Sequence, residues 1–363
     1  MADIFQIAES FRIAGKPLAF KRIGSGHIND SYHVTIAQPD SPGYFLQRIN
    51  HGIFKDIPSL TKNILRVTDH IANRLHSPSI DFSFSELRLV PAGNGDYYYR
   101  DPENNYWRMF NFLKGTRSYD VVPGVSLAYE GGRAFGRFQL LTSDLDAAEL
   151  KETIPDFHNV STRLASFYNV CREDKFRRIQ EVAAEVKFIA ERSDKMNEFF
   201  RMAMNGQLPS RVTHNDTKFN NILFDNSDRA VCIVDLDTVM PGLIHYDFGD
   251  AIRTGASTGT EDEADLQKVN IDLELFRAYS QGYLEVSRDF LTTAETAYLA
   301  FSARLMTFII GLRFLTDHIA GDGYYKTLFP GHNLRRARAQ FRLVRSMEKN
   351  APAMEKIISD LCK

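Results

Sequence analysis

The chain has 363 residues, of which 44 are basic and 46 acidic, so its formal net charge is −2. This near balance excludes the strongly basic surface that is typical of nucleic-acid-binding proteins, and it disfavours a basic membrane anchor. Three widely spaced cysteines, Cys171, Cys232 and Cys362, make neither a disulfide framework nor a zinc motif. We therefore expect a cytoplasmic protein that binds neither nucleic acid nor a membrane, and we take a monomer as the default.

The spacing of apolar residues changes about one third of the way along the chain. Up to residue 112 it predicts a short N-terminal helix, strands at 19–23, 31–36 and 44–49, a helix at 60–75, and strands at 86–91, 97–99 and 107–112. Beyond that point it predicts helices at 127–141, 179–203, 272–285, 293–318 and 334–348, with a loop and short strands between 212 and 237. The most apolar stretch, 299–315, contains Arg304 and Arg313, which favours a buried helix over a membrane span.

A chain of this length is expected to form two domains or lobes. The pattern predicts an α+β protein with a small β-rich N-terminal lobe, residues 1–112, and a larger, mainly helical C-terminal lobe, residues 113–363. The linker is expected near residues 111–115.

The most informative segment is the loop at 213–221, which contains the pattern H-x-D-x-x-x-x-N. Phosphoryl transfer from ATP requires a carboxylate to accept the proton of the attacking hydroxyl, oxygen ligands for Mg²⁺ and a positive group near the γ-phosphate. Asp216 can supply the first, Asn221 the second and Lys218 the third. Protein kinases use a loop of this kind, although theirs begins H-R-D.

A predicted hairpin follows this loop, with strands around 222–224 and 230–234. Its second strand ends at Asp235, so the hairpin would return a carboxylate to the side of Asn221, as a Mg²⁺ site with bound phosphates requires. We interpret Asp235 as the principal Mg²⁺ ligand. Alternation along a strand would place Asp237 on the same side, where it either helps to bind the metal or is solvated.

Two further acidic features receive a structural interpretation. The letters D-F-G at 247–249 match a protein-kinase motif, but they lie well past the hairpin and directly before a helical pattern. We interpret Asp247 as a residue that caps that helix or braces a loop. The acidic run at 261–263 is interpreted as the solvated start of a helix.

Two candidate phosphate-binding features lie in the N-terminal part. Gly24 and Gly26 would allow backbone N–H groups to approach a triphosphate, although G-x-G-x-x-N lacks a third glycine and is also typical of a plain turn. On the third strand, where kinases usually present a lysine, the nearest cation is Arg48, which either binds phosphate or is an exposed strand residue. The predicted helix at 60–75 offers no glutamate to pair with it.

Taken together, these motifs resemble the aminoglycoside-phosphotransferase and choline-kinase superfamily, from the first helix to the last. The resemblance implies a two-lobed, protein-kinase-like fold with ATP as co-substrate and Mg²⁺ as cofactor. Four longer strings are similar to those of N-acetylhexosamine 1-kinases, which phosphorylate the anomeric hydroxyl of GlcNAc or GalNAc; they are GSGHIN (24–29), RVTHNDTK (211–218), DLDTVMPG (235–242) and GLRFL (311–315).

This narrower resemblance also implies an acceptor site. His27 and Arg313 would bind the hexosamine beside Asp216, which itself would contact the sugar. Arg313 lies on an apolar helical pattern, where an isolated charge is costly and calls for a partner. That partner is either the sugar or Asp317, one helical turn further along.

Three alternatives stay open. A kinase of the same fold could act on an amino alcohol such as choline or homoserine, and choline would favour an aromatic or acidic cage. The D-x-D at 235–237 could belong to a metal-dependent glycosyltransferase, but Asp216, Lys218 and Asn221 would then lack a common purpose. A non-catalytic pseudokinase would not require Asp216, Asn221 and Asp235 all to be present.

Overall fold

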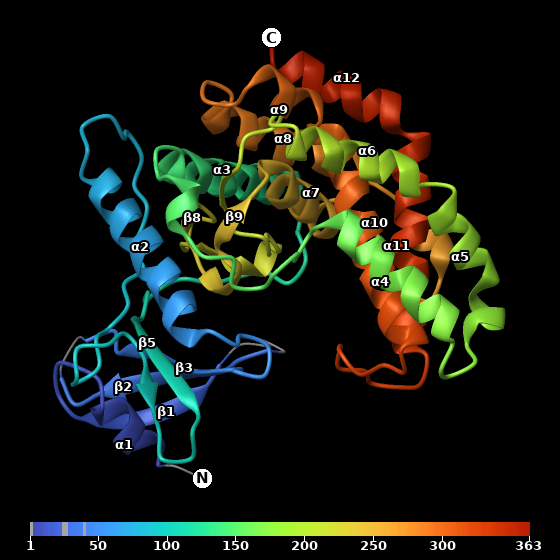
Figure 1. The fold of residues 1–363 in the computed structure, drawn as a ribbon. Helices are drawn as coiled ribbons and strands as arrows, with labels where there is room; N and C mark the ends of the chain where they lie inside the picture. The colour runs from blue at the N-terminus through green and yellow to red at the C-terminus, as the bar shows by residue number, and fades with distance from the viewer. Residues whose placement is uncertain (1–2, 24–27, 39–40) are drawn as a thin grey trace.

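The computed structural model describes residues 3–23, 28–38 and 41–363, and within them it shows a small sheet lobe beside a larger helical one (Figure 1). The sheet lobe contains α1 (Ile4–Glu9), β1 (Pro17–Arg22), β2 (Asp30–Ile36), β3 (Tyr44–Ile49), α2 (Ile57–Leu75), β4 (Tyr99–Arg100) and β5 (Tyr106–Asn111). Its strands form an antiparallel sheet in the order β1-β2-β3-β5-β4.

The two faces of this sheet are covered by different helices. Leu46 of β3 packs in one apolar cluster with Ile7 of α1, whereas Ile49 of the same strand packs in another cluster with Ile57 of α2. The second cluster continues through α2 into the helical lobe and includes Phe138, so one apolar core crosses from lobe to lobe. Figure 1 shows α2 rising from the sheet toward this lobe.

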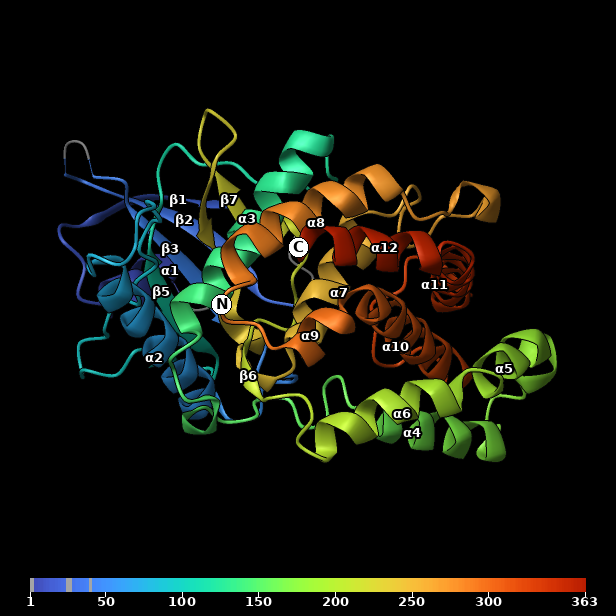
Figure 2. The ribbon, with the colours of Figure 1, turned by 90° about the horizontal axis from the view of Figure 1, so that it is seen from above.

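The helical lobe is built around a few long helices, with the short strands next to the sheet lobe. Figures 1 and 2 both show α5 far from the sheet, and α4 and α6 beside α10. The elements are α3 (Val125–Thr142), α4 (Val160–Glu173), α5 (Ala183–Ala190), α6 (Ser193–Met204), β6 (Arg211–Thr213), β7 (Ile222–Phe224), β8 (Ala230–Ile233), β9 (Met240–Gly242), α7 (Ile244–Gly255), α8 (Leu273–Ser287), α9 (Thr293–Ala297), α10 (Leu299–Ile319), α11 (His332–Lys349) and α12 (Ala351–Leu361).

Glycines allow α3 and α8 to pack backbone against backbone. A Cβ on Gly132 would lie 2.0 Å from the carbonyl oxygen of Tyr279, and one on Gly282 would lie 2.1 Å from that of Tyr129. Both distances are far below van der Waals contact, so any larger residue would push the helices apart. This contact holds α3 firmly, and α3 in turn supports the loop that carries Asp216.

Helix α10 is long and apolar enough to cross a membrane, with a mean hydropathy of 1.5, but 83% of that stretch is buried inside the protein. Its side chains form the centre of a third apolar cluster, which includes residues of α4, α6 and α11. The helix is therefore the core helix of this lobe, as its internal arginines indicated.

Several secondary-structure predictions were wrong. The helix predicted at 293–318 is two helices, α9 and α10, with Tyr298 between them. The segment 86–91 contributes only an isolated bridge, Leu89 to Phe110, instead of a strand. The helix predicted at 179–203 is divided into a 3₁₀ turn, α5 and α6. Arg192, at the break, stacks on Phe188 at 3.7 Å and pairs with Glu348 of α11 at 2.8 Å. Tertiary contacts thus override a locally helical pattern.

Candidate active site

The loop predicted to be catalytic follows β6, which pairs with β9. His214 is fully buried; its Nε2 donates to the carbonyl of Val234 at 3.0 Å, and its Nδ1 accepts from the backbone N–H of Asp216 at 3.3 Å. Asn215 has a φ of 63°, a left-handed conformation that asparagine tolerates better than most residues. The histidine and the turn together fix the direction in which the Asp216 side chain points.

Asp247, near the start of α7, braces this loop. Its carboxylate accepts hydrogen bonds from the backbone N–H groups of His214 at 2.8 Å and Asn215 at 2.7 Å, and from the amide of Gln139 at 2.8 Å. Burial raises the pKa of Asp247 to about 6, and these hydrogen bonds oppose the rise. The bracing role predicted for Asp247 is therefore confirmed.

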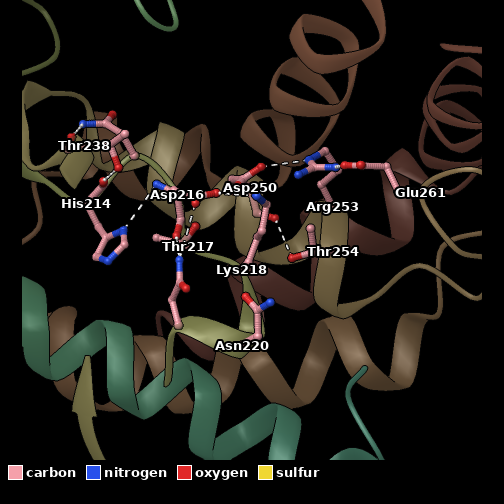
Figure 3. Close-up of polar contacts among 12 residues, drawn as sticks. His214, Asp216, Thr217, Lys218, Asn220, Thr238, Asp250, Arg253, Thr254 and Glu261 are labelled. Atoms are coloured by element: carbon pink, nitrogen blue, oxygen red, sulfur yellow. Dashed lines mark hydrogen bonds and ion pairs between the residues drawn. The ribbon is translucent and has the colours of Figure 1, made fainter. Parts of the chain in front are cut away.

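Asp216 and Lys218 face each other in an ion pair of 3.0 Å (Figure 3). Burial acts to raise the pKa of Asp216, but the charges of Lys218 and His214 and the hydrogen bond from Lys218 together outweigh it, and the pKa is lowered. In turn, the Asp216 carboxylate raises the pKa of the Lys218 ammonium. Both groups are therefore charged at neutral pH, a carboxylate able to accept a proton and a cation able to neutralise growing negative charge.

The hairpin of β7 and β8 brings the predicted metal ligands together. Its strands pair Ile222 with Ile233, and the N–H of Val234 donates to the carbonyl of Asn221 at 2.9 Å, which places Asn221 beside the end of β8. Asp235 follows directly, in a left-handed conformation with a φ of 64°. The predicted hairpin and the return of Asp235 to Asn221 are confirmed as geometry.

The side-chain oxygen atoms of Asn221 and Asp235 suit a magnesium ion. Asn221 donates through its Nδ2 to the carbonyl of Asp216 at 2.8 Å, while its Oδ1 accepts no hydrogen bond from a described residue. Asp235 reaches the surface, but desolvation by the surrounding protein, and then the negative charges of Asp237 and Asp216, raise its pKa to about 7. A divalent cation would relieve this repulsion, and Mg²⁺ is commonly held by one or two carboxylates together with substrate phosphates.

Asp237 lies elsewhere than strand alternation predicted. Residues Leu236–Thr238 form a 3₁₀ turn instead of an extended strand, so Asp237 is turned into the protein and is only 4% exposed. Its carboxylate pairs with Arg108 of β5 and accepts a hydrogen bond from Asn29 at 2.6 Å. Its role as a second metal ligand stays a prediction, and these contacts give it another role.

Of the two interpretations given for Arg48, its position in the structure agrees with the exposed strand residue, and phosphate binding by Arg48 stays a prediction. Arg48 shares a face with Leu46, toward α1, and pairs with Asp30 on the neighbouring strand, with Nε to Oδ2 at 2.9 Å. The residue that points toward Asp237 is its neighbour Gln47, through Arg108. Successive strand residues point to opposite faces of the sheet, so Gln47 faces the helical lobe and Arg48, one residue later, faces away from it.

The structure adds a charged cluster behind Lys218 that the sequence analysis missed (Figure 3). Arg253 of α7 is 4% exposed; its Nε pairs with Asp250 at 2.8 Å and its Nη1 with Glu261 at 2.9 Å. The acidic run interpreted as a solvated helix start is therefore a loop whose first residue joins this cluster. An arginine at i+3 from an aspartate on a predicted helix was the only local signal.

Arg313 of α10 lies among aromatic rings. Its guanidinium carbon is 4.8 Å from the ring centre of Phe157 and 5.7 Å from that of Tyr325. The neighbouring His158 donates from Nε2 to the carbonyl of Asn215 at 3.0 Å, which connects this group to the catalytic loop. Burial, and then the charge of Arg313, lower the pKa of His158 to about 3.

The sequence left Asp317 open as an ion-pair partner of Arg313, but the two residues do not pair in the structure. The two carboxylate oxygens of Asp317 accept from the backbone N–H groups of Tyr324 at 2.8 Å and Tyr325 at 2.9 Å. Asp317 thereby holds the turn that brings the Tyr325 ring to Arg313. Gly24, Gly26 and His27 lie outside the described residues, so their predicted roles stay predictions.

Comparisons with known proteins agree with this architecture. The model of the phosphotransferase enzyme family matches residues 19–287. Three solved structures match with TM-scores of 0.65, 0.58 and 0.53. They are an aminoglycoside phosphotransferase from Alicyclobacillus acidocaldarius (11% identity, 98% of this chain and 96% of that one), a choline kinase from Cryptosporidium parvum (13%, 95% and 93%) and a spectinomycin phosphotransferase in complex with ADP and spectinomycin (11%, 95% and 98%).

At these identities the solved structures show the fold, which is the kinase-like arrangement predicted from the sequence. The family match is more specific, because it spans most of the chain and includes Asp216, Lys218, Asn221 and Asp235. The chain therefore belongs to the phosphotransferase enzyme family, whose members transfer phosphate from ATP, and it has the kinase-like fold of aminoglycoside and choline kinases.

Proposed function

We propose that this phosphotransferase uses ATP and Mg²⁺ to phosphorylate the anomeric hydroxyl of an N-acetylhexosamine, GlcNAc or GalNAc, and releases the sugar 1-phosphate. The family match supports the phosphotransferase part of this proposal. The choice of acceptor depends on one observation, a pair of arginines next to His158, whose ring contacts the loop that carries Asp216 through the carbonyl of Asn215.

These two arginines are Arg163 and Arg313, and both are half-buried. Arg313 is held between aromatic rings, and Arg163 of α4 donates twice to the carbonyl of Phe157, at 3.1 and 3.3 Å. Neither forms an ion pair with a carboxylate in the described part of the chain. The rings of Phe157 and Tyr325, which could have caged a cation, already have a guanidinium group against them. This environment repels a cationic acceptor such as choline.

The same arginines suit a neutral sugar. A guanidinium group presents several N–H donors in a fixed plane, and the hydroxyl and acetamido oxygens of an N-acetylhexosamine are acceptors. A free sugar must be oriented by such directional hydrogen bonds, because phosphoryl transfer depends mainly on positioning and on charge stabilisation. We therefore assign Arg313 to the acceptor.

In the reaction, Asp216 orients the anomeric hydroxyl and accepts its proton as the oxygen attacks the γ-phosphorus. The new O–P bond forms as the bond between the γ-phosphorus and the bridging oxygen breaks, so ADP leaves. Lys218 neutralises charge on the transferred group. Asp235 and Asn221 would hold Mg²⁺, which when bound would neutralise negative charge on the nucleotide phosphates.

The test is ADP release with GlcNAc, GalNAc, choline, ethanolamine and homoserine as acceptors. We expect turnover with at least one hexosamine and none with its methyl glycoside, which keeps the other hydroxyls but lacks a free anomeric one. Asp216→Asn should lose that turnover with its circular dichroism spectrum unchanged. Turnover with an amino alcohol alone, or with the methyl glycoside, would overturn the proposed acceptor.

A further inference from the structure

The face of β3 that meets the helical lobe carries Gln47, at a place where a kinase is expected to present a cation. Gln47 is 8% exposed, and its amide nitrogen donates to Ser31 on β2 at 3.0 Å. Its amide oxygen is the acceptor that faces β5. Strand β3 therefore offers an acceptor for a positive group instead of a positive group of its own.

Arg108 of β5 supplies that group. It lies directly opposite Gln47 in the strand register, and its side chain is 1% exposed. Nε donates to the Gln47 amide oxygen at 3.0 Å and Nη2 donates at 2.8 Å, so the guanidinium plane is fixed from two points. The remaining nitrogen, Nη1, pairs with Asp237 of the helical lobe. A buried arginine costs free energy unless such partners compensate its charge.

Asp237 binds a second part of the sheet lobe as well. Asn29 donates to its Oδ2 at 2.6 Å, and the Asn29 amide oxygen accepts from the backbone N–H of Asn50 at the end of β3. Asn29 follows the glycine segment 24–27 in the sequence. One carboxylate therefore connects β5 and the segment after these glycines to the turn that begins at Asp235.

We propose that Arg108, in place of a cation on β3, is the N-terminal lobe's positioning residue for the nucleotide, and that it acts through its buried ion pair with Asp237. The pair fixes the turn 235–237, with its predicted metal ligand, against the sheet on which the nucleotide phosphates would lie. In protein kinases the corresponding lysine and glutamate both belong to the N-terminal lobe. Here the pair joins the two lobes, so separating the lobes breaks a buried ion pair.

This inference rests on the use of ATP in the proposed function but not on the identity of the acceptor, so MgADP binding tests it without any sugar. Isothermal titration is carried out with wild type, Arg108→Gln, Arg108→Lys and, as a matched control, Arg22→Gln, whose side chain is 69% exposed and pairs with Asp30 at the surface. We expect MgADP to bind Arg108→Gln about tenfold or more weakly, Arg108→Lys at an intermediate level, and Arg22→Gln as the wild type.

A merely structural role is distinguished in two ways. Steady-state kinetics should show a raised KM for ATP with the KM for the acceptor unchanged. The double variant Arg108→Gln/Asp237→Asn should regain the thermal stability that the single variant loses, because no charge is left buried alone, but it should not regain MgADP affinity.

Wild-type MgADP affinity in a folded Arg108→Gln or double variant would overturn the inference. If Arg48→Gln lost more MgADP affinity than Arg108→Gln, the positioning residue would be Arg48 on β3, and the inference would also be overturned. If the wild type binds MgADP but phosphorylates no hexosamine, the proposed acceptor fails and this inference is still decided by the same titrations.

Discussion

Replacing Asp247 by alanine should loosen the catalytic loop without touching substrate. Three buried donors, the N–H groups of His214 and Asn215 and the amide of Gln139, would lose their acceptor. Each unsatisfied buried donor costs about 1–3 kcal/mol, or about 3–9 kcal/mol together. Against this, a pKa raised from 3.8 to about 6 means that ionising the buried carboxylate already costs about 3 kcal/mol at neutral pH. The expected net loss of unfolding free energy at pH 7 is therefore about 3 kcal/mol.

The pH dependence gives the sharper test. Because the folded state holds the Asp247 proton more tightly than the unfolded state does, the wild type loses stability from this group as the pH rises from about 4 through about 6. The Asp247→Ala variant lacks this loss, so its deficit relative to wild type should shrink by about 3 kcal/mol between pH 4 and pH 7. Urea denaturation at several pH values measures it, with Asp289→Ala, an exposed carboxylate, as control.

Activity should fall as well, because Asp247 fixes the backbone on either side of the His214–Asn215 peptide and hence the position of Asp216. A displacement of about 1 Å at a reacting group lowers kcat by about 100-fold. The reasoning is refuted if Asp247→Ala is as stable as the wild type, if its deficit grows toward neutral pH, or if kcat is unchanged.

Three other substitutions test separate parts of the structure. Asp235→Asn should lower kcat at least about 100-fold with no loss of melting temperature, because the Asp235 side chain makes no hydrogen bond with a described residue; a steep melting loss would contradict this. Gly282→Ala should destabilise the protein by at least about 1–3 kcal/mol in a thermal melt, since its Cβ would lie 2.1 Å from a backbone oxygen of α3, whereas Gly124→Ala meets open space and should stay near wild type. Arg211→Met should cost about 3–5 kcal/mol by leaving the buried carboxylate of Glu295 unpaired, and adding Glu295→Gln should recover part of that loss if the pair is what matters.

The parts of the site that could be predicted are those encoded in short stretches of sequence. Asp216, Lys218 and Asn221 lie within six residues of one another, and a hairpin of a few residues returns Asp235 to them. Short connections leave few possible geometries, so a local pattern was enough to bring these groups together. The same is true of Asp247, whose place at a helix start indicated a bracing role.

The sequence could not decide the points where geometry depends on distant contacts. Arg48 and Gln47 are adjacent in sequence, and only the packing of β3 between α1 and α2 shows which of them faces the helical lobe. Asp237 was placed by strand alternation, but the chain turns at Asp235. Arg108 gave no local signal, because its partners Gln47 and Asp237 come from another strand and from the other lobe.

The arrangement of charge around Lys218 shows why the buried cluster behind it matters to the chemistry. In the proposed reaction Lys218 turns its charge toward a phosphoryl group, yet three carboxylates, Asp216, Asp250 and Glu261, act on its ammonium. Arg253 takes two of these as its own partners at 2.8 and 2.9 Å, which leaves Asp216 as the direct partner of Lys218. Asp216 in turn has to leave that pair to orient the acceptor hydroxyl. The near-zero net charge of the chain therefore says nothing of how charge is arranged at this site. In the proposed reaction, the pairing of Arg253 with Asp250 and Glu261 leaves Lys218 and Asp216 free to separate and contact phosphate and acceptor.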